Sequence, residues 1–177
     1  MFDLPTYQAL LANVDAAATN NEKGERFEEL CQYLLSELDG VKVEGRDAVM
    51  NAEEIDIVLW NAQSEEVLKP FENIILVECK NWSVAVGAPA LDSFISKLRR
   101  RTMKTGIFIA ANGVTGDFLN GNSNNGAIEI IKAALQEGIR VIILNRADLD
   151  AINSLNDLRT LIRKRYCGLF IHKLFNN

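Results

Sequence analysis

The sequence predicts an α/β fold, with a mixed central sheet of about five strands flanked by helices on both faces. The chain has 177 residues, of which 48% are hydrophobic, and this suits one domain with a sizeable core. Some segments show the two-residue period of a strand and others the 3.6-residue period of a helix. Three strand-like segments follow one another before helices and strands alternate, which favours a mixed sheet.

The first part of the chain predicts two helices. Residues 5–18 form a modest helix candidate. The segment EKGERFEELCQYLLSELDG, residues 22–40, is a stronger one, because its apolar residues recur three and four positions apart. Gly40 stands where such a helix would end.

The pattern then changes to that of strands. Segments rich in Ile, Val and Leu, typical of strands, are VKVEGRDAV at 41–49, EEIDIVLW at 53–60 and NIILVECK at 73–80. Helical and strand-like segments alternate in the rest of the chain: a helix that begins at Pro89, a strand at 105–111, a helix at 126–138, a strand at 140–145 and a last helix at 147–165.

Composition narrows the class of protein. No apolar run reaches the roughly 18 residues of a membrane span, and the acidic N-terminal stretch lacks the basic cluster of a secretory signal. The three cysteines are far apart and form no CxxC pair, so we expect small buried thiols in a reducing compartment. These features predict a cytoplasmic protein with no membrane partner.

Charge is unevenly distributed along the chain. The net charge is −5, yet residues 1–80 carry 17 acidic and 6 basic side chains, while residues 81–177 carry 7 and 13. An acidic site beside a basic surface would produce this asymmetry, although surface charge also serves solvation alone.

Charged residues end two of the predicted core strands. Because side chains alternate between the faces of a strand, Glu78 and Lys80 share a face on one strand, and Asp56 lies on the corresponding face of the preceding strand. An antiparallel register that matches apolar to apolar and charged to charged gives these pairs: Trp60 with Ile74, Val58 with Leu76 and Asp56 with Glu78.

Two carboxylates across a sheet repel each other, and a divalent cation between them would turn that repulsion into binding. Lys80 could then hold an attacking water or stabilise a phosphoryl oxyanion. The structural alternative is that Glu78 and Lys80 are solvated residues at the end of a strand and that Asp56 protects an edge strand from aggregation.

The motif resembles a known family. Asp56, then Glu78-Cys79-Lys80 on the next strand, after a helix with Gly-x-x-Phe-Glu at 24–28, looks like the PD-(D/E)xK nuclease superfamily. Within it the chain is most similar to the Mrr-like restriction endonuclease catalytic domain, which it also resembles in the strand GIFIAANGVT, residues 106–115. The chain lacks the Pro-Asp dipeptide; Glu54-Ile55-Asp56 stands in its place.

The resemblance implies a restriction-endonuclease-like fold and a single nuclease-like domain over 1–177, with a helical extension at 1–20, a core at 22–150 and a helical tail at 151–177. It implies an endonuclease that hydrolyses DNA phosphodiester bonds, in prokaryotic defence or DNA processing. Asp56 and Glu78 would bind Mg²⁺, for which Mn²⁺ can substitute. Lys80 would assist the water, and Glu28 would complete the acidic cluster.

The helix allows a separate test of Glu28. At 100° per residue, Glu28 lies about 90° from the centre of the apolar face, whereas Glu25 and Glu29 face water. Glu28 is therefore the acidic residue of the motif that can point along the core, unless it is a boundary residue with no role.

Basic residues suggest where DNA would bind. One run, KLRRRTMK, supplies the candidate phosphate contacts Lys97, Arg99, Arg100, Arg101 and Lys104. Solvated helix ends are the equally plausible reading. A double-strand cut would need a homodimer, and a regulatory or recognition partner is a further expectation.

Two other classes of function stay open from sequence. One is a non-catalytic nucleic-acid-binding or protein-interaction domain that keeps the nuclease fold. The other is a small-ligand sensor, but the chain has no glycine-rich phosphate loop that would support it.

Overall fold

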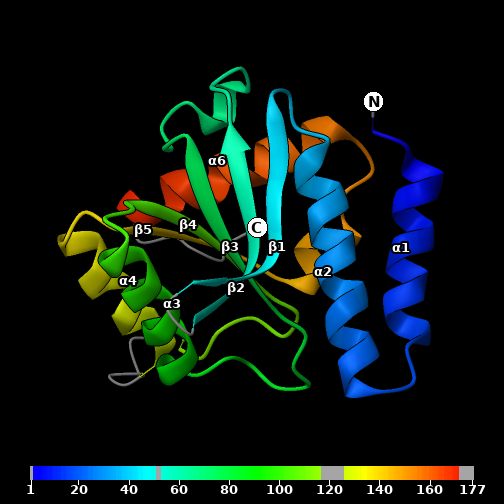
Figure 1. The fold of residues 1–177 in the computed structure, drawn as a ribbon, viewed down its shortest axis with the longest axis horizontal. Helices are drawn as coiled ribbons and strands as arrows, with labels where there is room; N and C mark the ends of the chain where they lie inside the picture. The colour runs from blue at the N-terminus through cyan, green and yellow to red at the C-terminus, as the bar shows by residue number, and fades with distance from the viewer. Residues whose placement is uncertain (1, 51–52, 117–125, 172–177) are drawn as a thin grey trace.

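The computed structural model describes residues 2–50, 53–116 and 126–171, and for 47–50 and 53 it describes the backbone only (Figure 1). The helices in these ranges are α1 (Leu4–Ala16), α2 (Asn20–Ser36), the 3₁₀ helix η1 (Glu66–Leu68), α3 (Ala88–Arg100), α4 (Ala127–Gln136), α5 (Arg146–Asp150) and α6 (Leu155–Ile171). The strands are β1 (Val41–Met50), β2 (Glu53–Asn61), β3 (Ile74–Lys80), β4 (Thr105–Ala110) and β5 (Arg140–Leu144).

The strands form one mixed sheet in the order β1-β2-β3-β4-β5. The pairs β1–β2 and β2–β3 are antiparallel, while β3–β4 and β4–β5 are parallel. Helix α3 connects β3 to β4, and α4 connects β4 to β5, as parallel neighbours require. The predicted mixed α/β fold is confirmed.

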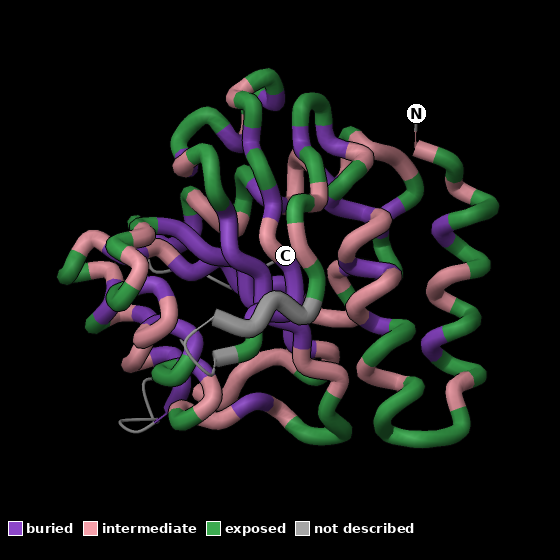
Figure 2. Tube along the Cα trace, viewed as in Figure 1, coloured by how far each residue is buried: buried purple, intermediate pink, exposed green. Residues whose placement is uncertain are grey.

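Helices cover both faces of the sheet, and two apolar clusters lie between the layers (Figures 1 and 2). One cluster joins the sheet to α1, α2, α5 and most of α6. The other joins it to α3 and α4. Strand β3 supplies both because its side chains alternate: Ile75 and Val77 belong to the first cluster and Leu76 to the second.

The prediction of a single helix at 147–165 was wrong. The chain forms α5 and then α6, with a break between Asp150 and Leu155. Capping side chains cause the break: the Ser154 hydroxyl accepts the Asp157 N–H (3.3 Å), and Asp157 accepts the Asn153 N–H (3.1 Å). Such local bonds favour a helix start over continued helix.

The pairing of β2 with β3 sets the place of the charged residues. The predicted pairs Trp60 with Ile74 and Val58 with Leu76 are confirmed. The ladder ends at Ile57 with Val77, so the expected pairing of Asp56 with Glu78 is not part of it. The Asp56 carboxylate takes the N–H of Cys79 instead (2.7 Å), and a side chain replaces the backbone partner there.

None of the helices within the described ranges has both the length and the apolar character needed to cross a membrane.

Candidate active site

Two buried carboxylates lie where the ladder of β2 and β3 ends. Asp56 and Glu78 are each only 6% exposed, among apolar neighbours that fill both faces of the sheet. Burying a carboxylate without compensation is costly, so such groups carry partners or a function. The structure brings the two residues close together, and their role in a common site stays a prediction.

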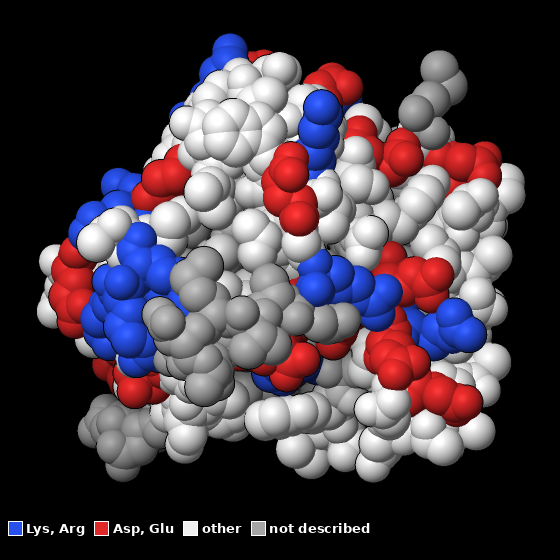
Figure 3. Space-filling view, in the orientation of Figure 1, with Lys and Arg blue, Asp and Glu red and all other residues white. Residues whose placement is uncertain are grey.

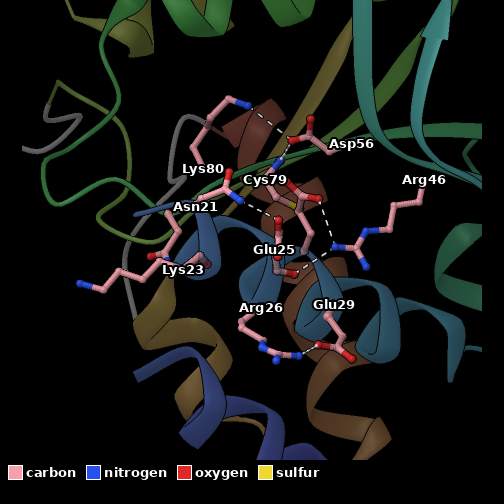
Figure 4. A network of polar contacts seen from close by, with 11 residues as sticks. Asn21, Lys23, Glu25, Arg26, Glu29, Arg46, Asp56, Cys79 and Lys80 are labelled. Atoms are coloured by element: carbon pink, nitrogen blue, oxygen red, sulfur yellow. Dashed lines mark hydrogen bonds and ion pairs between the residues drawn. The ribbon is translucent and has the colours of Figure 1, made fainter. Parts of the chain in front are cut away.

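Lys80 bridges the two carboxylates. Its Nζ lies 2.7 Å from Glu78 Oε1 and 3.4 Å from Asp56 Oδ2. Figure 4 shows the Lys80 side chain extending toward Asp56, which also accepts the Cys79 N–H. One ammonium therefore contacts both acidic residues.

Lys97, which the sequence predicts as a phosphate contact, lies against the candidate site. Its Nζ lies 2.7 Å from Glu78 Oε2, and its side chain is 11% exposed. It reaches Glu78 from α3, whose apolar face packs on the sheet. The helical angle that placed Glu28 at the edge of an apolar face could have flagged Lys97 as well, because Lys97 is one turn from the buried Phe94.

The pKa values of Asp56 and Lys80 are both raised, but for different reasons. Burial raises the pKa of Asp56 and the nearby Glu78 raises it further, against the opposing effects of Lys80 and the Cys79 N–H. Burial alone would lower the pKa of Lys80, but the Glu78 and Asp56 carboxylates outweigh it and the pKa is raised. Lys80 thus stays charged at neutral pH, while the negative charge of Asp56 is incompletely compensated.

The donor set fits a hard divalent cation. Both hydrogen bonds to the Asp56 side chain go to Oδ2, and Oδ1 accepts none from the residues that the structure describes. Mg²⁺ prefers carboxylate oxygens, needs only one or two of them and keeps several waters. Asp56 and Glu78 would therefore suffice, with no third carboxylate required.

Glu28 lies on α2, on the side of the sheet toward Cys79. Its side chain is 19% exposed, and its Oε2 is 3.6 Å from Arg46 Nη2. Arg46 also donates to the Glu25 carbonyl (3.1 Å), and Figure 4 shows it reaching across to α2. Within 2–50, 53–116 and 126–171 no group of three or more His, Cys, Asp or Glu is placed to hold a metal. The role of Glu28 in the acidic cluster stays a prediction.

Cys79 separates the two charged residues of β3 and faces the other way. It is buried, as is Cys31 on α2. A hydrogen bond with Cys31 and burial raise the pKa of the Cys79 thiol well above its ordinary value, so the thiol is unreactive. The expectation of buried thiols was wrong for Cys167, which is exposed on α6.

The basic run 97–104 is engaged in contacts within the protein. Besides Lys97, which binds Glu78, Arg99 donates to both oxygens of Glu137 (2.7 and 3.0 Å), and Arg101 donates to the Lys97 carbonyl (3.2 Å). Figure 3 shows Lys and Arg side chains gathered over α3 and α4, with acidic side chains among them. Phosphate binding by Arg99, Arg100, Arg101 and Lys104 stays a prediction.

Comparisons with known proteins agree with the geometry. The structure is similar to that of the DNA modification-dependent restriction endonuclease AspBHI, with a TM-score of 0.52 and 19% identity; the match covers 97% of this chain and 41% of that one. At this identity the likeness concerns the fold, and this chain spans less than half of that protein's length.

A weaker likeness links the chain to Pyrococcus furiosus SfsA in complex with Ca²⁺, with a TM-score of 0.38 and 23% identity over 69% of this chain and 55% of that one. That TM-score is too low to support a shared fold. No curated protein matches the sequence. The family model described as "Mrr_cat: Restriction endonuclease" matches residues 19–150, about three quarters of the chain. The chain therefore belongs to the Mrr-type restriction endonuclease catalytic family.

Proposed function

We propose that this protein is a Mg²⁺-dependent endonuclease that hydrolyses DNA phosphodiester bonds. Its active site would consist of Asp56, Glu78 and Lys80. One observation carries the proposal: two buried carboxylates converge on one ammonium where β2 and β3 stop pairing. A chain has little structural reason to bury like charges together. Membership of a restriction endonuclease family supports the same reaction.

Asp56 and Glu78 would hold the divalent cation, and Mn²⁺ could replace Mg²⁺ there. When bound, the cation would polarise the phosphate and lower the pKa of a coordinated water. Asp56 offers its Oδ1 for this contact, since Oδ2 is used by Cys79 and Lys80.

Lys80 acts as a hydrogen-bond donor in this scheme. The Glu78 and Asp56 carboxylates raise the pKa of Lys80, which favours the protonated ammonium. From its position against both carboxylates the ammonium can orient the attacking water and stabilise the charge that develops on the phosphoryl oxygens. Lys97 binds the other oxygen of Glu78, where it would compete with the cation.

DNA is the substrate that the family supports, and cleavage of both strands would need a second copy of the domain or two successive nicks. We propose that a partner or a further region of polypeptide selects the target, since the chain spans 41% of AspBHI, a modification-dependent enzyme. A part in prokaryotic defence or DNA processing, in the cytoplasm, belongs to the same proposal.

A non-catalytic binding domain is the second candidate, and one observation favours it. Both oxygens of Glu78 are already bound by lysine ammonium groups at 2.7 Å. A nuclease site that had lost its cation could be neutralised in this way.

Incubation of supercoiled plasmid with wild-type protein, Asp56→Asn and Glu29→Gln separates these candidates. Glu29 is a matched carboxylate on α2, 44% exposed and paired with Arg26. We expect Mg²⁺-dependent nicking or cutting by the wild type and by Glu29→Gln, and binding without cutting by Asp56→Asn. Wild-type protein that binds plasmid but leaves it intact with Mg²⁺ and with Mn²⁺ would overturn the nuclease proposal.

A further inference from the structure

A cavity of about 720 Å³ opens beside Lys80, outside the carboxylate cluster. Its walls are the end of α1, the first turns of α2, the end of β3 and the loop after it, the loop after β4 and the start of α5. The lining residues used below are Lys23, Gly24, Lys80, Trp82, Asn112 and Arg146. The volume falls in the range of small-ligand pockets, roughly 300–1,000 Å³. A single nucleoside fits such a space, whereas a base-paired duplex does not.

Trp82 gives the cavity an aromatic wall. Trp82 is 46% exposed. The backbone beneath it is fixed on both sides: Asn112 Nδ2 donates to the Trp82 carbonyl (2.5 Å), and Asn81 Nδ2 donates to the Lys23 carbonyl (3.0 Å). A rigid loop therefore presents an exposed indole, and nucleic-acid bases stack on such surfaces.

Gly24 keeps the part of the wall formed by α2 clear. A glycine in a helix interior destabilises the helix relative to alanine, and packing does not require one here, since a Cβ at position 24 would meet nothing within 4 Å. By contrast, a Cβ at Gly106 would meet Phe94 at 2.7 Å. The absent side chain at Gly24 leaves open space in the cavity itself.

Charge at the rim suits a phosphate. None of the ion pairs found among the described residues involves Lys23, and Figure 4 shows its side chain extending away from the labelled carboxylates. Lys80 also lines the cavity, although its ammonium contacts Glu78 and Asp56. Arg146 adds little free positive charge, because it donates to Asp15 (2.8 Å) and Asp150 (2.7 Å).

We propose that this cavity binds one unpaired DNA base, stacked on Trp82, with Lys23 at the neighbouring phosphate. The substrate is then DNA with a single-stranded or locally opened nucleotide next to the bond that is cut. The placement beside the cut rests on the proposed nuclease function, but binding of the base can be measured without cleavage.

Tryptophan fluorescence tests the proposal, because the chain has two tryptophans. Trp60 is 40% exposed and pairs with Ile74, at the end of β3 remote from Lys80, so it is a matched control. Trp60→Phe leaves Trp82 as the reporter, and Trp82→Phe leaves Trp60. Each variant is titrated with single-stranded thymidine oligonucleotide in EDTA, which prevents cleavage, while anisotropy of a labelled oligonucleotide reports binding.

We expect saturable quenching in Trp60→Phe and none in Trp82→Phe. Gly24→Leu, which fills the cavity from a helix position that accepts a side chain, should weaken single-strand binding at least tenfold, whereas Gly24→Ala should bind normally. Circular dichroism shows whether each variant is folded. If Gly24→Leu does not fold, Gly24→Ala and the fluorescence titration still test whether the cavity binds a base.

Unchanged Trp82 fluorescence with oligonucleotide bound would overturn the proposal, as would equal quenching by duplex or stronger binding of the matching RNA. Plasmid cutting without Trp82 quenching would refute this inference alone. Quenching without plasmid cutting would refute the nuclease function and leave the base site intact.

Discussion

Glu65 and Asp56 are both buried carboxylates, 3% and 6% exposed, but their surroundings differ. Glu65 accepts from Nε and Nη2 of Arg159 through both oxygens at 2.9 to 3.1 Å, and from the Asp39 N–H. From the residues that the structure describes, Asp56 accepts through one oxygen, from Lys80 and Cys79. Burial raises the pKa of each. At Glu65, Arg159 and the N–H groups of Asp39 and Val67 together more than reverse this, and the pKa is lowered, whereas that of Asp56 stays raised.

The difference separates a carboxylate that is fully paired within the fold from one that could still bind a cation. Arg159 lies on α6 and Glu65 just before η1, so their bidentate pair fastens the last helix to the loop between β2 and β3. Asp56 retains an electrostatic cost that a cation would relieve. Burial of a carboxylate alone therefore does not indicate an active site, whereas burial with incomplete compensation does.

The largest effect should come from Lys80→Met. This change keeps most of the side-chain stem and removes the ammonium that contacts both Glu78 and Asp56. Cleavage should fall about a hundredfold or more, because a donor to developing charge is lost. Calorimetric titration should still show Mg²⁺ binding; loss of binding would mean that Lys80 organises the carboxylates instead of assisting the reaction.

Substitution of the two carboxylates should change the free energy of unfolding in opposite directions when both variants are measured in EDTA, without metal. Glu65→Gln leaves the Arg159 guanidinium poorly paired and should lower the free energy of unfolding by about 1–3 kcal/mol. Asp56→Asn removes an uncompensated charge and should raise it. Urea denaturation measures both, and a loss of stability in both variants would erase the distinction.

Lys97→Met should change the Mg²⁺ concentration that cleavage requires. In the wild type the Lys97 ammonium occupies Glu78 Oε2 at 2.7 Å and competes with a cation there. The Mg²⁺ concentration that gives half-maximal cleavage should fall a few-fold in the variant. A rise would show that Lys97 is needed to direct the carboxylate. Lys132→Met, which disrupts a surface pair with Glu129, is the control.

The smallest expected effect is on how the free energy of unfolding depends on pH, again measured in EDTA. The lowered pKa of Glu65 makes its contribution to stability constant above its ordinary value of 4.5 and lost at lower pH. The raised pKa of Asp56 means that its cost disappears as pH falls toward its ordinary value of 3.8. Between pH 7 and 4.5 the deficit of Glu65→Gln should stay level, while the advantage of Asp56→Asn should shrink. Denaturation series at several pH values would show the reverse if the assignments were exchanged.

Much of the fold and part of the site could be predicted from sequence. Periodicity located the strands, and matching apolar and charged ends gave the register of Trp60 with Ile74. The apolar pattern did not predict the break between α5 and α6, because the break depends on capping hydrogen bonds of Ser154 and Asp157 that compete with continuation of the helix.

Contacts between elements distant in sequence were harder to foresee. Lys97 in a run of basic residues has the composition of a surface, and only the packing of α3 on the sheet turns it toward Glu78. The Glu65–Arg159 pair joins residues 94 positions apart, so no local pattern signals it. The cavity likewise needs α2, two loops and α5 in place before Trp82 and Gly24 face one space.

The most direct test is the thermal unfolding temperature of three proteins as Mg²⁺ is added: wild type, Asp56→Asn and Glu65→Gln. A cation that binds the folded state at 100 times its Kd adds about 2.7 kcal/mol, which is several degrees for a chain of this size. We predict that the wild type and Glu65→Gln rise by equal amounts from different starting temperatures, and that Asp56→Asn does not rise. A wild type that responds to neither Mg²⁺ nor Mn²⁺, or an Asp56→Asn variant that rises as much as the wild type, would contradict the assignment of Asp56 to a cation site.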